Sequence, residues 1–249
     1  MEFTLGQTLA AYVSAACGAV LAVSMGVSHR QLCALISFAA GTLLSVTLFH
    51  ILPEAWQEWD VLSIFVSLAS GYGLFFIISR YISHVCPACA ASHFEHHHYE
   101  SPKVIKFGSV FGLLAIALTV HSLMDGIAIA LGHEASESTN HSVFFTIAIH
   151  KLPEGLALCA LLMKAGYEKK RAIFLTLILE LSTIAGWAAG HWGLSGNLDF
   201  RWLDLIMVHI AGGFVYLALH AAINEAKDHS FKFILPFFMM GFLFMALVR

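Results

Sequence analysis

Two short apolar stretches each place a histidine and a carboxylate four residues apart. The first, from His121 to Gly126, reads His-Ser-Leu-Met-Asp-Gly, and the second, from His150 to Gly155, reads His-Lys-Leu-Pro-Glu-Gly. Residues four apart on a helix share a face, and imidazole and carboxylate are donors that divalent transition metals prefer. Ionisable residues inside a membrane are costly and mark functional sites. The pattern predicts an intramembrane metal site with four candidate ligands: His121, Asp125, His150 and Glu154.

The composition excludes an ordinary soluble domain. Of the 249 residues, 59% are hydrophobic and 12% are charged, whereas soluble domains carry about 25% charged residues. Apolar runs near the ~20 residues that cross a bilayer lie at 7–27, 32–52, 61–82, 105–132, 141–166, 172–193, 203–222 and 232–248. The first run lacks the basic flank of a signal peptide, so we interpret it as a retained span. The sequence predicts an all-α integral membrane protein of eight transmembrane helices, with residues 1–249 as a single transmembrane domain.

The basic residues predict the orientation, because cytosolic connections are rich in Lys and Arg. One set of connections carries ten: Arg30, Arg80, Lys103, Lys106, Lys164, Lys169, Lys170, Arg171, Lys227 and Lys232. The opposite set carries Arg201 and Arg249. We therefore expect the termini outside and the 83–104 connection in the cytosol. At 1.5 Å per residue, His121 and His150 then lie about 14–16 Å from the outer face, near the midplane.

Three further groups of polar residues lie in or beside the spans. Glu180 is isolated in an apolar run about 12 Å from the cytosolic face, and we interpret it as a ligand or a bridging residue. His50 and Glu54 close the second span outside, and His220 and Glu225 close the seventh in the cytosol, as an entrance and an exit would. The two histidine-ending segments resemble one another on helices of opposite direction, which favours an inverted repeat.

The connection at 83–104 is rich in soft and borderline metal ligands. We interpret it as a cytosolic metal-scavenging or regulatory loop with seven candidate ligands: His84, Cys86, Cys89, His93, His96, His97 and His98.

These motifs resemble those of the ZIP family of divalent metal transporters. The fourth-helix motif, His-Asn-x-x-(Asp/Glu)-Gly, is met by residues 121–126, and the fifth-helix motif, His-(Glu/Asp)-x-Pro-(His/Glu)-(Glu/Gly), by 150–155. Glu180 matches the sixth-helix glutamate, residues 50–55 match His-x-x-Pro-Glu-Ala, and residues 211–220 match the seventh-helix run.

The resemblance implies a 3+2+3 helix bundle with an inverted repeat. It also implies import of Zn²⁺, as a transported substrate, toward the cytosol by alternating access through a site on the fourth, fifth and sixth helices. Cd²⁺, Mn²⁺ and Fe²⁺ are further candidate substrates, and no organic cofactor or nucleic-acid partner is expected. The host membrane would be the plasma membrane, a bacterial inner membrane or an organelle membrane.

Two positions depart from the family pattern. Many relatives bind a second metal through an Asn after the fourth-helix His and an acidic residue after the fifth-helix His. Here these positions hold Ser122 and Lys151. A lysine ammonium would repel a second cation, so we expect one transported metal, with Lys151 supplying the charge of the missing ion.

Other classes of function stay open at this point. An intramembrane zinc hydrolase could use midplane His and Asp ligands, but it needs an open water position and a general base. A metal exporter would differ in transport direction, and a sensor would use the His-rich loop with the spans as an anchor. The sequence leaves metal selectivity, coupling to protons and homodimerisation undecided.

Overall fold

The computed structural model describes residues 2–24, 28–82, 104–132, 137–164, 166–194, 200–228 and 231–248. Every regular element in these ranges is helical: α1 (Glu2–Ser24), α2 (His29–Val46), η1 (Thr47–Ile51), α3 (Leu52–Glu58), α4 (Val61–Ile77), η2 (Ile78–Ile82), α6 (Val104–Gly132), α7 (Glu137–Lys164), α8 (Lys169–Ala188), η3 (Ala189–Leu194), α9 (Phe200–Asp228) and α10 (Phe231–Leu247). The η segments are π-helical turns that continue the helix before them.

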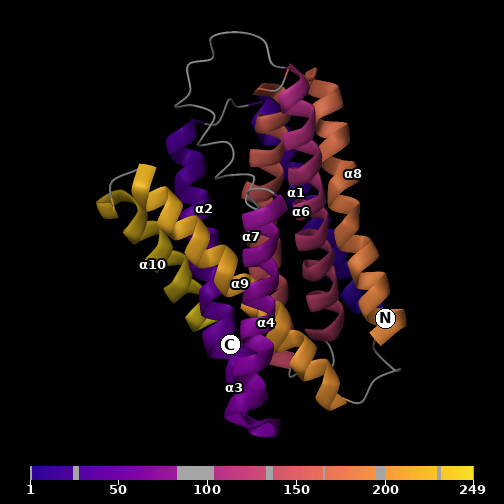
Figure 1. The fold of residues 1–249 in the computed structure, drawn as a ribbon, viewed down its shortest axis with the longest axis vertical. Helices are drawn as coiled ribbons and strands as arrows, with labels where there is room; N and C mark the ends of the chain where they lie inside the picture. Colours follow the sequence, from indigo (N-terminus) through magenta and orange to yellow (C-terminus); the bar gives the residue numbers. More distant parts are fainter. Residues whose placement is uncertain are drawn as a thin grey trace.

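The helices confirm the eight-helix membrane bundle. Among the described residues, six helices are long and apolar enough to cross a membrane, and two shorter apolar helices cover Leu118–Gly132 and Phe231–Leu247. Figure 1 shows both termini toward the end of the bundle where α3 lies, as an even number of spans requires.

The second helix is longer than the predicted 32–52. It continues through η1 and α3 as far as Glu58. The π-helical turn lies directly before Pro53, which has no N–H to donate and crowds the preceding turn. Asp60 then starts α4, because its carboxylate accepts hydrogen bonds from the backbone N–H groups of Leu62 and Ser63. The hydrogen bond from the Ser63 hydroxyl, together with these backbone bonds, lowers the pKa of Asp60.

The helices pack as two groups of four. One group contains α1, α6, α7 and α8, and its most extensive contacts join α1 to α7 and α6 to α8. The other contains α2, α4, α9 and α10, and its main contacts join α2 to α10 and α4 to α9. Figure 1 shows α2, α9 and α10 on one side and α1, α6 and α8 on the other, with α7 between them. An inverted repeat would relate α1 to α8, α2 to α9, α4 to α10 and α6 to α7. Under this exchange the α1–α7 contact becomes the α8–α6 contact, and the α2–α10 contact becomes the α9–α4 contact. The observed helix contacts therefore agree with an inverted repeat.

Glycines allow the two helices of each contacting pair (α1–α7, α6–α8, α2–α10 and α4–α9) to approach closely. A Cβ added at any of them would overlap a backbone carbonyl oxygen of the partner helix. Small residues permit such close approach between helices in lipid. The glycines match across each pair: Gly18 with Gly155, Gly126 with Gly186, Gly41 with Gly241, and Gly71 with Gly212. Each glycine pair joins two helices of the same group, two pairs in each group, so each group is tightly packed internally.

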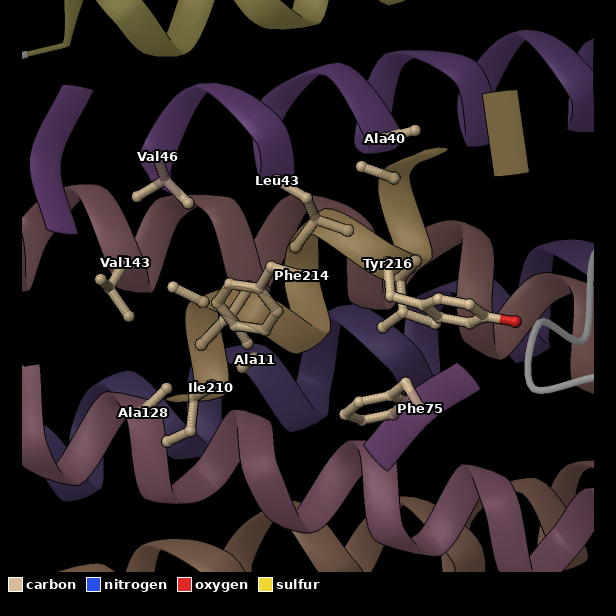
Figure 2. Close-up of a cluster of buried hydrophobic side chains, with 14 of the residues drawn as sticks. Ala11, Ala40, Leu43, Val46, Phe75, Ala128, Val143, Ile210, Phe214 and Tyr216 are labelled. Atoms are coloured by element: carbon tan, nitrogen blue, oxygen red, sulfur yellow. The ribbon is translucent and has the colours of Figure 1, made fainter. Parts of the chain in front are cut away.

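An apolar core lies where the two groups meet. Figure 2 shows side chains from α2, α6, α7 and α9 converging on Phe214. Leu43 and Val46 come from α2, Val143 from α7 and Ile210 from α9, and all are buried. Two rings of this core, Phe75 and Phe214, pack against His121 on α6 and His150 on α7.

Candidate metal centre

The four predicted ligands come together between α6 and α7. His121, Asp125, His150 and Glu154 each offer a donor atom within 4.8 Å of the others, and all four side chains are buried. The Asp125 Oδ2 atom lies 3.2 Å from His150 Nε2 and 3.5 Å from His121 Nε2, and His121 Nε2 lies 3.6 Å from Glu154 Oε2. Four ligands around Zn²⁺ at 2.0–2.2 Å in a tetrahedron stand roughly 3.3–3.6 Å apart. These three donor pairs therefore lie at about the separation found around a single tetrahedral ion.

The hydrogen bond of His150 prepares its ring for a cation. Its Nδ1 atom lies 3.0 Å from the backbone carbonyl oxygen of Thr146, and a carbonyl oxygen only accepts, so Nδ1 carries the proton. In the neutral ring, Nε2 then presents a lone pair. That lone pair faces the Asp125 carboxylate, which also offers only lone pairs. Either a metal ion bound by both atoms or a second proton on the ring relieves this repulsion, and the same orientation by a carbonyl is common in histidines that bind metals.

Lys151 is fully buried directly beside this group. Its Nζ atom lies 3.1 Å from Asp125, 3.0 Å from Glu154 and 2.9 Å from Glu180. Nζ also donates a 2.6 Å hydrogen bond to the Ser122 hydroxyl. One ammonium group thus contacts three carboxylates at once. With the three carboxylates ionised and both histidines neutral, the site carries a net charge of −2, which a single divalent ion neutralises.

Glu180 meets Lys151 rather than joining the four donors. Its Oε2 atom accepts the hydrogen bond from Nζ and lies 3.5 Å from the Ser122 hydroxyl. In this arrangement Glu180 anchors the lysine from α8. Its role as a metal ligand stays a prediction.

The predicted entrance and exit residues lie on η1, α3 and α9, and they are not part of the group of four donors. His50 is buried in the π-helical turn η1, and Glu54 lines a pocket beside it. At the far end of α9, the His220 ring stacks on Tyr216, and the Asn224 amide donates to His220 Nε2 at 2.9 Å. Glu225 is buried one residue further on.

The predicted loop ligands fall outside the described residues. They are His84, Cys86, Cys89, His93, His96, His97 and His98.

Asp204 is the polar residue that the sequence reasoning missed. It is buried near the start of α9 and lines the same pocket as Glu54. The sequence feature that could have identified Asp204 is a single carboxylate within Trp-Leu-Asp-Leu-Ile, at the edge of an apolar run.

Eight apolar helical segments around buried imidazole and carboxylate donors define a multi-pass membrane protein equipped to hold a divalent metal. The family model described as ZIP zinc transporter matches residues 88–249, more than half of the chain. The protein belongs to this family, whose members are transporters and not enzymes.

Similar proteins come from yeast, bacteria and mammals. The zinc transporter YKE4 of Saccharomyces cerevisiae is 26% identical over 86% of this chain and 70% of the yeast protein. The zinc transporter ZupT of Stenotrophomonas maltophilia is 27% identical over 91% of this chain and 86% of its own length. The match to the mouse zinc transporter SLC39A7, at 28% identity, covers 51% of this chain and 28% of the mouse protein.

Proposed function

We propose that residues 1–249 form one transporter domain that imports a divalent transition metal, in the first place Zn²⁺, toward the cytosol. The observation that carries this proposal is the buried group of His121, Asp125, His150 and Glu154, whose donor atoms all lie within 4.8 Å of one another. The names of YKE4 and ZupT as zinc transporters support zinc as the substrate.

The centre holds one metal ion in this proposal, and Lys151 replaces a second. The ammonium contacts Asp125, Glu154 and Glu180 at 2.9–3.1 Å, so it already occupies the space among these carboxylates. One divalent ion brings the site from −2 to neutral, whereas two would leave it at +2 in a region of low dielectric. Burying such an uncompensated charge costs several kcal/mol per ion.

The division into two helix groups supports alternating access. The centre is built from α6, α7 and α8 and lies wholly within one group. From the other group, the rings of Phe75 and Phe214 face His121 and His150, with ring centres 6.1 and 6.4 Å apart. Hydrogen bonds such as Ser14 Oγ to the Ala148 carbonyl and Ser67 Oγ to the Leu205 carbonyl lie within single groups. An apolar boundary between two internally bonded groups favours sliding of one group against the other.

Uptake of ⁶⁵Zn²⁺ into cells tests this proposal. At matched surface levels, wild type should accumulate the isotope, and Asp125→Asn and Glu154→Gln should not. Glu168→Gln is a matched control, because Glu168 is exposed just before α8 and makes no capping hydrogen bond. Uptake by Asp125→Asn equal to that of wild type would contradict the assignment of the centre.

A further inference from the structure

We propose that Asp204 and Glu54 form a second divalent-cation site at the outer end of the bundle, where an ion is held before it reaches the centre. This inference rests on the proposed transport function and adds a residue, Asp204, that neither the family motifs nor the central donor group contains. Its ligands are carboxylate oxygens, so it would take a partly hydrated divalent ion.

The environment of the Asp204 carboxylate favours a bound cation. It is 8% exposed, and within the described part of the chain its Oδ2 atom is buried with no hydrogen-bond partner. Burying a carboxylate without a partner is costly, and buried charges are therefore paired or coordinate metals. The negative charges of Glu54 and Glu58 lie near Asp204 and add electrostatic repulsion to the cost of burying its carboxylate. A divalent cation among these carboxylates compensates all of them.

The pocket that Asp204 faces has the lining of a cation site. Its walls come from α3 with the preceding turn, from α7 and from α9: Ile51, Glu54, Ala55, Thr139, Asp204 and Met207. Two carboxylates and a hydroxyl supply oxygen ligands, and the Met207 thioether is a softer donor. The helices that contribute come from both groups, so a sliding movement would change the geometry of this pocket.

A polar stripe on α7 connects the pocket with the centre. Thr139, Ser142, Thr146 and His150 are spaced by three, four and four residues, and so they share one face over about 16 Å. All four are buried, and the hydroxyls of Ser142 and Thr146 have no hydrogen-bond partner within the described residues. These oxygens could replace the water of a passing ion.

A buried aromatic ring lies at the inner end of this stripe, because Phe214 packs against His150 with ring centres 6.4 Å apart. Val46, Val143 and Ile210 are buried around Phe214 (Figure 2). We expect an ion at Asp204 to stay on the outer side of these apolar side chains until the groups move.

Equilibrium dialysis with Zn²⁺ tests the outer site without relying on transport. Purified full-length protein carrying His121→Ala and His150→Ala has lost two central ligands, and the Cys- and His-rich loop contributes equally to every variant. Adding Asp204→Asn should remove one equivalent of bound Zn²⁺, whereas Asp204→Glu should retain it. Asp60→Asn is the matched control, because Asp60 is an exposed acid that caps α4 and asparagine also caps. Equal zinc binding with and without Asp204→Asn, or an equal loss in Asp60→Asn, overturns the site.

Uptake kinetics give a second readout. In otherwise wild-type protein, Asp204→Asn should raise the Zn²⁺ concentration at half-maximal uptake about ten-fold, since one charged ligand is lost. The maximal rate should stay within about two-fold, because the central ligands are intact. An unchanged half-maximal concentration overturns the proposal. If wild type itself takes up no zinc, the transport function fails, and the dialysis result still decides the outer site.

Discussion

Replacing Lys151 with methionine should make the stability of the protein depend on metal. The substitution keeps an unbranched side chain of similar length but removes the charge that contacts Asp125, Glu154 and Glu180. Removing one partner of a buried ion pair costs about 3–5 kcal/mol, because the other charge stays buried without compensation. At roughly 2–4 °C per kcal/mol for a chain of this size, the midpoint of thermal unfolding in EDTA should fall by about 6–20 °C.

Zinc should reverse this loss, since the vacated space is lined by carboxylates. Binding at a hundred times the dissociation constant stabilises a protein by about 2.7 kcal/mol per site. The assay is thermal unfolding in detergent at one scan rate, with EDTA and then with excess Zn²⁺. Lys169→Met, at an exposed position in the first turn of α8, controls for the loss of a lysine. An unfolding midpoint of Lys151→Met in EDTA equal to that of wild type would refute the argument that the ammonium holds the three carboxylates.

Two further predictions concern packing and the number of metal ions. Gly155→Ala should lower stability by about 1–3 kcal/mol in thermal unfolding, because its Cβ would overlap the Ala15 carbonyl oxygen on α1. Gly73→Ala should be neutral or stabilising, since a Cβ there meets open space. In the double variant Ser122→Asn/Lys151→Asp, a second metal should bind, raising the zinc measured per purified protein by one equivalent over wild type. Unchanged zinc content would contradict the replacement of a second ion by Lys151.

The spacing of the candidate ligands made the buried group of four donors predictable from the sequence. His121 with Asp125 and His150 with Glu154 are four residues apart, so any helix places each pair on one face, and both pairs lie in apolar runs of spanning length. The short connection between these two runs makes them antiparallel neighbours. The eight spans followed from length and hydropathy alone.

Contacts between helices that lie far apart in the sequence were harder to predict. The charge of Lys151 was predicted to replace an ion, but its simultaneous contact with three carboxylates depends on the packing of α8 against α6 and α7. For the same reason Glu180, expected as a ligand, could not be foreseen as the partner of Lys151. Asp204 was missed because its significance comes from the pocket it shares with Glu54, which lies about 150 residues earlier in the chain.

The most direct test of the central claim is zinc entry into proteoliposomes that contain the purified protein and a trapped zinc-sensitive dye. Wild type should transport zinc, and His150→Ala should not, although it reconstitutes to the same level. His191→Ala, which alters a half-buried histidine stacked on Trp187, is the control and should transport zinc as wild type does. Zinc entry through His150→Ala at the wild-type rate would contradict the proposal that the metal passes through the centre on α6 and α7.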